Sequence, residues 1–557
     1  MKNVKITVIL FWLILIVAAV IRLWQFGKVP VGLDWDEASL GYNAFSILHT
    51  GRDEYGKWLP VILQSFGDYK PALYAYLIIP FISFMGLTVE AVRLPSALAG
   101  IATVALTYFL AKKVCNSEKM GLLAMLLLAI SPWHIQFSRI GFESNVGLFF
   151  NVALVTFFVY GLKKHWLLFL SAICFALSIY TYQSEKVFTP LIALLVMSIW
   201  WKDIWKLPKK TIIVTIALAV VLLAPMVQFM ITDKNAFARA AGVSVFSQAN
   251  GFTVQSSDKV LADKEVGDKV GAILDNRRVL MVKTIIGNYL VHFDPNWLFV
   301  TGVNTRHRAP NMGLLYLWEL PFLLIGIYQL LFSKLDRKYK YLIFGWFLLA
   351  PVPAAVTTGV PHEVRVLNIL PMFQIFTGFG ILTVSSYVKQ WEKLIQVAFM
   401  VVCIGFISLN IAYYFDQYFV QQNYYAARDW RYGYQDAVKY VASQAQNYDS
   451  ILVSNKNLMD QSYIFFLFYL QYPPQLYQQS VAQGMEQGDD HAFGKYEFRF
   501  VDPNMYNCKP RIMVVGHYDQ FTQPLPAQHI VYYPDGTPGI EILGKNTLLC
   551  PKSIKPL

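Results

Sequence analysis

Three acidic residues lie within four positions in the segment Gly32-Leu33-Asp34-Trp35-Asp36-Glu37-Ala38, shortly after the first apolar stretch of the chain. The residues that follow have helical apolar spacing, which places Asp36 and Glu37 in a first helical turn. Carboxylates at that position cap a helix and offset its dipole, but capping needs only one of them. A carboxylate there can also take the proton of an attacking hydroxyl. We therefore predict that Asp36 is a general base.

Cations lie in several other short segments that we place on the same side of a membrane. These segments are 66–74, 91–98, 131–143, 180–186 and 361–365. Short outer loops of membrane proteins normally avoid Lys and Arg, so these cations indicate a bound anion such as a phosphate. Snorkelling of Lys70 and Arg93 and an aromatic-belt role for Tyr182 are the alternatives. The candidate ligand contacts are Lys70, Arg93, His134, Arg139, Tyr182, Lys186 and Arg365.

The elements that position these residues are membrane spans. Hydrophobic residues make up 56% of the 557-residue chain and charged residues only 15%, against about 25% in ordinary soluble domains. The mean hydropathy is +0.42. This composition excludes a disordered chain and a typical soluble enzyme. A bilayer core needs about 20 apolar residues as helix, and eleven segments qualify: 6–26, 94–111, 120–136, 144–162, 166–182, 187–201, 211–231, 313–333, 341–358, 367–387 and 394–415.

The charge pattern sets the orientation of these spans. With the N-terminus in the cytoplasm, the inner segments hold 17 Lys and Arg residues and four acids, as the positive-inside rule expects. The net charge of +12 therefore reflects topology, and we expect no nucleic-acid partner. The odd number of spans puts the C-terminus outside the plasma membrane. The large outer segments are then 27–93, 232–312 and 416–557.

The outer segments carry recognisable secondary-structure patterns. Strands are expected at 450–454, 511–516, 529–533 and 540–543, and helices at 436–446 and 460–472. These elements predict a small extracytoplasmic α/β accessory domain at 416–557, beside a transmembrane catalytic domain at 1–415. An amphipathic helix is expected at 277–292. An oxidising compartment would permit a disulfide between Cys508 and Cys550, which is a candidate pair and not a required one.

The order of these motifs resembles that of the GT-C glycosyltransferases of the protein O-mannosyltransferase and aminoarabinose-transferase type. That order is an acidic pair after span one, Lys-Pro-x-Leu-x-Tyr from Lys70, Arg-Leu-Pro-Ser-Ala-Leu from Arg93, Ser-Arg followed by an acid around Arg139, and a link containing Lys186. The match extends over about 27–200, with weaker correspondence to 380. The resemblance implies an all-α polytopic fold of the GT-C type with about eleven transmembrane helices.

The resemblance also implies an activity and a set of roles. Members take a sugar, a hexose or a pentose, from a polyprenyl-phosphate carrier and pass it to a protein, lipid or glycan acceptor on the outer face. It implies that Asp36 is the base, that Glu37 supports it and that Glu143 is the second family acid. Lys70 and Lys186 would hold the carrier phosphate, with Arg365 as a further contact. Transfer by single displacement would invert the anomeric centre.

The resemblance leaves a metal open. Family members of the aminoarabinose type have an acid directly before Lys-Pro, whereas this chain has Tyr69 there and Asp68 one residue earlier. A divalent metal would then take Asp68, with His307 or His292 as a second ligand. The rival interpretations of the whole chain are a transporter or flippase of a lipid-linked anion and a membrane scaffold. The enzyme hypothesis requires Asp36, Glu143, Lys70 and Lys186 to converge at the outer leaflet.

Overall fold

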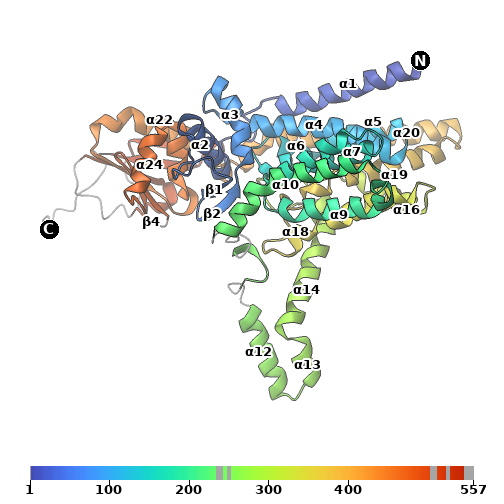
Figure 1. The fold of residues 1–557 in the computed structure, drawn as a ribbon. Coiled ribbons are helices and arrows are strands. Elements are labelled where there is room, and N and C mark those ends of the chain that lie inside the picture. Colours follow the sequence, from blue (N-terminus) through green and yellow to red (C-terminus); the bar gives the residue numbers. More distant parts are fainter. Residues whose placement is uncertain are drawn as a thin grey trace. The chain divides into compact units, whose positions relative to one another are not determined.

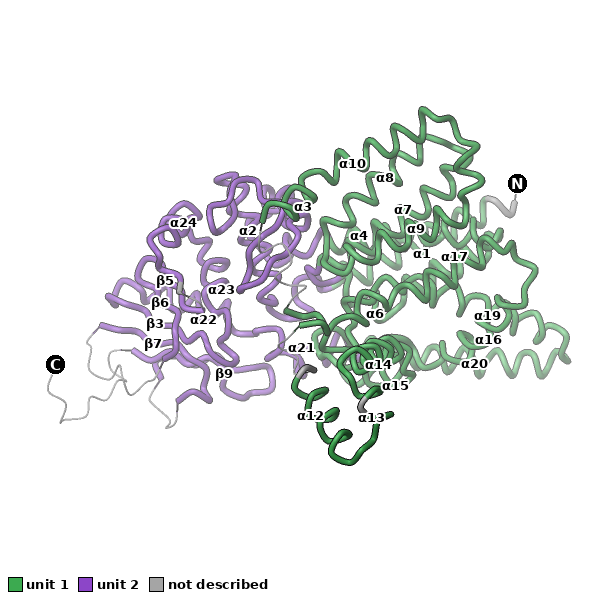
Figure 2. Tube along the Cα trace, turned by 60° about the horizontal axis from the view of Figure 1, so that its bottom comes forward, with its two compact units in different colours: residues 1–24, 96–138, 143–415 green, residues 25–95, 139–142, 416–557 purple. Residues whose placement is uncertain are grey.

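The computed structural model describes residues 2–233, 242–247, 252–487, 489–501, 511–521 and 527–544. The chain divides into two compact units, which Figure 2 colours separately. Unit 1 comprises Met1–Trp24, Ser96–Ser138 and Glu143–Phe415, and unit 2 comprises Gln25–Pro95, Arg139–Phe142 and Asp416–Leu557. Unit 2 therefore joins the first outer segment to the C-terminal segment. The bounds of these units differ from those of the expected domains 1–415 and 416–557, and that domain division stays a prediction.

Unit 1 is helical (Figure 1). Its long helices are α1 (Lys2–Leu23), α4 (Val89–Cys115, which begins in unit 2), α5 (Glu118–Ile130), α7 (Glu143–Gly161), α8 (Leu167–Ile179), α9 (Glu185–Ile204), α10 (Lys209–Thr232), α16 (Glu319–Phe332), α17 (Arg337–Leu349), α19 (Met372–Val388) and α20 (Lys393–Asp416). The short elements are α6 (Pro132–Ser138), η2 (Val291–Phe293), α15 (Pro295–Phe299), α18 (Val352–Ala355) and η3 (Leu367–Ile369). Between α10 and α15 lie α12 (Phe252–Glu265), α13 (Lys269–Leu274) and α14 (Arg277–Leu290).

Seven helices of the described chain are long and apolar enough to cross a membrane, and eight if the bent pair α5–α6 forms one span. The bend of 63° falls at Ser131-Pro132, because proline cannot continue the hydrogen bonding of α5. Three further apolar helices are shorter: α3 (Leu73–Met85), α8 and α16. The chain is thus a multi-pass membrane protein with a mostly helical fold, and the count of eleven spans stays a prediction.

Helices α16 and α19 cross at a pair of glycines. A Cβ atom added to Gly326 would lie 1.7 Å from the Phe376 carbonyl oxygen, and one added to Gly380 would lie 1.8 Å from the Phe322 carbonyl oxygen. Only glycine permits this approach of two helix backbones. The crossing fixes the two helices against each other.

Unit 2 contains a seven-stranded mixed sheet in the order β4-β5-β6-β3-β7-β9-β8. The strands are β3 (Ser450–Ser454), β4 (Glu486–Gln487), β5 (Asp490–Phe493), β6 (Tyr496–Arg499), β7 (Ile512–His517), β8 (His529–Tyr532) and β9 (Pro538–Leu543). The central strand β3 pairs in parallel with β6 and β7, and its sequence Ile-Leu-Val is buried as such strands require. The four expected strands are confirmed, and Cys508 and Cys550 lie outside the described residues.

The first outer segment packs on helices of the C-terminal segment within unit 2. It contains α2 (Trp35–Thr50), the hairpin β1 (Ile62–Ser65) and β2 (Asp68–Pro71), and α3. The C-terminal helices are α21 (Gln422–Tyr425), α22 (Tyr434–Gln444), α23 (Ser462–Tyr469) and α24 (Pro474–Ala482). Helix α2 contacts α23 and α24. The Tyr42 hydroxyl donates to the Tyr472 carbonyl at 3.0 Å, and a Cβ on Gly41 would lie 2.7 Å from Phe468. The C-terminal segment therefore supports α2, whose first turn contains Asp36.

Candidate active site

The Glu37 carboxylate is fully buried in unit 2 and serves as an acceptor for surrounding groups. Arg93 donates to it from Nε at 2.8 Å and from Nη2 at 2.9 Å, and the Gly141 N–H donates at 2.6 Å. The same guanidinium donates to the carbonyls of Pro30 and Gly32, at 2.8 and 2.6 Å. Two hydrogen bonds between the same guanidinium and carboxylate fix the relative orientation of these two groups. Glu37 and Arg93 therefore hold the loop before α2 against the start of α4 in unit 2.

Asp36, the neighbouring acid, has different surroundings. Its side chain is 29% exposed and forms an ion pair with Lys70, whose side chain is 11% exposed. Asp34 caps α2 by accepting a hydrogen bond from the Asp36 N–H at 2.9 Å. This cap fixes the backbone position of Asp36 in the first turn of the helix. Strand β2 supplies Lys70, which lies 5.2 Å from the centre of the Phe66 ring. Of the two adjacent acids, Asp36 is partly exposed and Glu37 is fully buried.

Arg139 is also buried in unit 2. Its Nη2 donates to the Val29 carbonyl at 2.9 Å and to the Gln25 carbonyl at 3.3 Å, and its guanidinium lies over Tyr418 and Phe419 at 5.5 and 4.9 Å. Backbone carbonyls and aromatic rings thus surround this guanidinium. Like Arg93, it holds the chain that leads into α2, and a phosphate contact by either arginine stays a prediction.

In unit 1, a buried polar network surrounds the first residue of α9. Glu185 accepts hydrogen bonds from Asn151 of α7 at 2.6 Å and from Asn368 of η3 at 2.7 Å. Thr189 and Ser178 extend the network to Asn151, at 2.9 and 3.2 Å. These bonds join three helices and η3 at one point. They fix the N-terminus of α9 and therefore the position of the next residue, Lys186.

Lys186 is half-buried at this helix start. Its ammonium group makes no hydrogen bond or ion pair with the part of the chain that the structure describes. A cation that is partly removed from water and lacks an anionic partner is suited to bind an anionic ligand. Lys70, paired with Asp36, lacks this property. The two lysines that the sequence predicts as phosphate contacts therefore have different surroundings.

The remaining predicted residues of unit 1 have individual surroundings. Glu143 begins α7 and is 3% exposed, and Tyr182 is half-buried before α9. His134 is fully buried in α6, where its Nδ1 lies 2.7 Å from an Arg22 nitrogen. The same guanidinium donates to carbonyl oxygens at the end of α5. His134 therefore lies in a contact between helices, and a direct substrate contact by this side chain stays a prediction.

Glu363 is the centre of a second cluster in unit 1. His307 Nδ1 lies 3.0 Å from its carboxylate, Trp297 Nε1 donates at 3.2 Å, and the N–H groups of Val303 and Asn304 donate at 3.3 Å. Burial alone would raise the pKa of Glu363, but the hydrogen bond from His307 and its charge outweigh burial and lower that pKa. The cluster closes the loop at 303–307 onto the loop at 361–365.

Arg365 is part of the second of these loops. Its Nη1 donates to the Thr357 hydroxyl at 2.6 Å and to the Thr358 carbonyl at 2.7 Å. These contacts use one terminal nitrogen of a half-buried guanidinium. A further contact from Arg365 to a ligand stays a prediction.

The metal candidates do not form a ligand set. Asp68 accepts the N–H of Tyr69 in its own turn at 2.7 Å, and His307 pairs with Glu363. Both ring nitrogens of His292 are engaged, at 2.7 Å with the Asn288 carbonyl and at 3.2 Å with the His362 N–H. Among the described residues, no group of three or more His, Cys, Asp or Glu is arranged to hold a metal ion.

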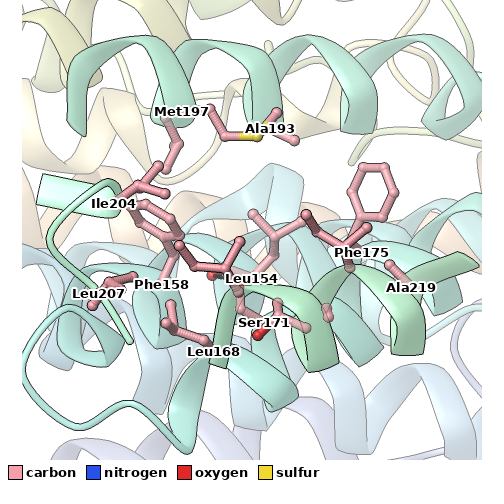
Figure 3. Close-up of a pocket in the computed structure, with 15 residues that line it drawn as sticks. Leu154, Phe158, Leu168, Ser171, Phe175, Ala193, Met197, Ile204, Leu207 and Ala219 are labelled. Atoms are coloured by element: carbon pink, nitrogen blue, oxygen red, sulfur yellow. Dashed lines mark hydrogen bonds between the residues drawn. The ribbon is translucent and has the colours of Figure 1, made fainter. Parts of the chain in front are cut away.

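An apolar cavity of about 250 Å³ lies between α7, α8, α9 and α10 (Figure 3). Leu154, Phe158, Phe175, Met197 and Ala219 are among its lining side chains, and nearly all the others are apolar too. Ile204 and Leu207 line it near the Lys-rich link between α9 and α10. A cavity with this lining suits a segment of hydrocarbon chain.

Sequence reasoning missed the network residues Asn151, Glu185 and Asn368. Asn151 lies inside a span, and polar side chains within spans are costly unless they have partners. That signal could have identified Asn151. Asn368 and Glu185, by contrast, are 183 residues apart in the chain, so their contact leaves no local sequence pattern.

Comparison with known proteins agrees with this architecture. Residues 69–227 match the family described as dolichyl-phosphate-mannose-protein mannosyltransferase. The structure is similar to ArnT from Cupriavidus metallidurans bound to undecaprenyl phosphate, with a TM-score of 0.55 at 12% identity, covering 98% of this chain and 99% of that chain. The same enzyme in the apo state gives a TM-score of 0.53 at 11% identity, covering 99% and 100%.

A more distant similarity is to the archaeal oligosaccharyltransferase AglB from Archaeoglobus fulgidus, solved with an inhibitory peptide and a dolichol-phosphate. The TM-score is 0.50 at 12% identity, covering 92% of this chain and 69% of that chain. No curated protein sequence matches the chain. The family match over residues 69–227 and the shared fold both agree with the order of motifs in the sequence, and they support a membrane glycosyltransferase of the GT-C type.

Proposed function

We propose that the chain transfers a sugar from a polyprenyl-phosphate carrier to a protein, lipid or glycan acceptor on the extracytoplasmic face of the plasma membrane. The proposal includes eleven spans, a cytoplasmic N-terminus and an outer C-terminal domain. The observation that carries it is the contrast between two adjacent acids, because Asp36 is 29% exposed while Glu37 is fully buried and engaged by Arg93. This is the arrangement of a reactive carboxylate on a rigid support.

In the proposed reaction, Asp36 takes the proton of the acceptor hydroxyl as the hydroxyl oxygen bonds to the anomeric carbon. The bond from that carbon to the carrier phosphate oxygen breaks, and its electron pair leaves with the phosphate. Attack on the face opposite the phosphate inverts the anomeric centre. Negative charge grows on the departing phosphate, and fixed cations that face it lower the barrier.

The contacts of the two lysines support different roles for them. Lys70 pairs with Asp36, so we propose that it orients the base. Lys186 has no hydrogen bond or ion pair among the described residues, so we propose that it binds the carrier phosphate. Glu143, at the buried start of α7, is proposed as a second acid of the reaction. The apolar cavity of unit 1 suits part of an isoprenoid chain.

Incubation of the purified protein, reconstituted in lipid, with radiolabelled polyprenyl-phosphate sugars tests the proposal. Transfer to an acceptor, or slow hydrolysis of the sugar in its absence, is the expected result. Movement of the intact lipid-linked sugar across the bilayer without either reaction would instead establish a transporter. Mass spectrometry of the lipid that copurifies selects the sugars to be tried first.

A further inference from the structure

The segment α12–α14 forms a helical arm that stands out from the rest of unit 1 (Figure 1). Helix α12 packs against α13 and α14, and the Ser256 hydroxyl donates to the Asp275 carbonyl at 3.0 Å. The arm is attached at the end of α14. There Asn288 donates to the carbonyls of Ala355 and Thr357 at 3.2 and 3.0 Å, and the Tyr289 hydroxyl donates to the Leu348 carbonyl at 2.8 Å.

Helix α14 has a face that none of the other described residues covers. None of its residues is buried. Val279, Val282, Ile286 and Leu290 are 38, 55, 53 and 59% exposed, and their spacing of three, four and four residues places them on one side of the helix. Four aliphatic side chains aligned in this way on an uncovered helix indicate an interaction surface.

The charges of the arm are unevenly distributed. All five acids of the arm precede α14, at Asp258, Asp263, Glu265, Asp268 and Asp275. Helix α14 itself has three cations and no acid: Arg277, Arg278 and Lys283. A cationic helix with an aliphatic stripe is complementary to a surface that combines negative charge with hydrocarbon, which is the headgroup region of an anionic bilayer.

The direction and place of α14 agree with that partner. The helix runs across the direction of the long helices of unit 1 (Figure 1). Its attachment is at Leu348, in the last turn of α17, and at Ala355, shortly after that helix. The other end of α17 begins at Arg337, beside a Lys-rich link. A helix that leaves this end of the bundle and runs across the spans lies parallel to the bilayer surface on the side opposite the Lys-rich links.

We propose that α14 lies in the outer leaflet interface, with its aliphatic stripe among the acyl chains and its cations on anionic lipid headgroups. The proposal does not depend on sugar transfer. The chain continues from the end of α14 into η2 and then to the loop of the Glu363 cluster. An arm bound in this way holds that part of the chain at a fixed depth relative to the bilayer.

Spin labels on the full-length protein in nanodiscs test this inference. The background variant has its five cysteines replaced, and single cysteines are placed at Val282 on the stripe and at Thr284 on the opposite side. In discs containing phosphatidylglycerol, the label at 282 should be accessible to oxygen and protected from a water-soluble nickel chelate, whereas the label at 284 should show the reverse. The triple substitution Arg277→Gln, Arg278→Gln and Lys283→Gln should lower the ratio of membrane-inserted to water-exposed α14, measured with the label at 282, by roughly fivefold per charge removed.

Two outcomes would overturn the inference. Equal exposure of position 282 to the nickel chelate in phosphatidylglycerol discs, phosphatidylcholine discs and detergent would place the stripe in water. Protection of position 282 from both reagents would place it against protein, either a second copy or another chain. Neither result bears on the glycosyltransferase proposal, because neither readout uses sugar transfer.

Discussion

Replacing Glu37 by glutamine removes the charge at the centre of the unit 2 anchor. The carboxylate accepts two bonds from Arg93, one from Gly141 and one, at 3.0 Å, from the Asp34 N–H. Glutamine keeps one acceptor oxygen and turns an NH2 group toward these donors, so the buried guanidinium loses its counter-charge. Breaking a buried ion pair by removing one partner costs about 3–5 kcal/mol.

That cost predicts two effects. If it is spent on local opening of the loop before α2, the ordered population falls by roughly 100-fold to several thousand-fold, and transfer falls with it. If it is spent on global stability, the unfolding temperature of the purified protein falls. Differential scanning fluorimetry combined with limited proteolysis between residues 27 and 36 separates these effects.

The matched control is Glu118→Gln. Glu118 accepts from Lys112 at 2.8 Å, the same distance as in the buried pair, but both side chains are well exposed. Exposed pairs contribute only about 0–1 kcal/mol, so this variant should behave like the parent. If Glu37→Gln unfolds at the same temperature, resists protease equally and transfers sugar as well as Glu118→Gln, the anchoring role of Glu37 is refuted.

Three further predictions follow from other parts of the chain. Burial raises the pKa of Glu54 to about 8, so between about pH 4.5 and 8 the unfolded chain binds fewer protons than the folded one. The free energy of unfolding should therefore fall by ~1.4 kcal/mol per pH unit over that range. Denaturation measured at a series of pH values should show a weaker dependence of this free energy on pH in Glu54→Gln, but not in the exposed control Glu265→Gln. Gly380→Ala should cost about 1–3 kcal/mol or more, because its Cβ would meet the Phe322 carbonyl, whereas Gly405→Ala in α20 meets nothing within 4 Å and should be neutral or stabilising in thermal unfolding; equal melting temperatures would contradict the helix crossing. Lys186→Gln should weaken donor affinity by roughly 10-fold to 100-fold through loss of a charge-assisted bond, with Lys202→Gln at the other end of α9 as the control, and an unchanged apparent affinity for the lipid donor would exclude the phosphate role.

Local patterns predicted the elements better than the contacts. The strand at Ser450–Ser454 and the amphipathic helix near Arg277–Leu290 follow from apolar periodicity, and both are confirmed. The break between α5 and α6 escaped the prediction, because hydropathy alone does not register the proline at its start. Span counts from hydropathy alone share this weakness.

The candidate site was predictable as a set of residue types and not as a set of roles. The sequence marks Arg93 and Arg139 as outer cations, but it does not show that carbonyls of Pro30, Gly32 and Val29 take up their donors. Likewise, the pairing of Asp36 with Lys70 depends on the register of the β1–β2 hairpin. Local sequence therefore predicts a phosphate-binding site, while tertiary contacts decide which cations already have partners within the protein.

The central claim is that Asp36 is the general base, and the direct measurement is sugar transfer by Asp36→Asn with radiolabelled lipid donor. Because Asp36 is partly exposed, we expect Asp36→Asn to lower the unfolding temperature less than Glu37→Gln does, to leave donor affinity unchanged and to lower the transfer rate by about 100-fold or more. Near-normal transfer by a well-folded Asp36→Asn variant would contradict the account.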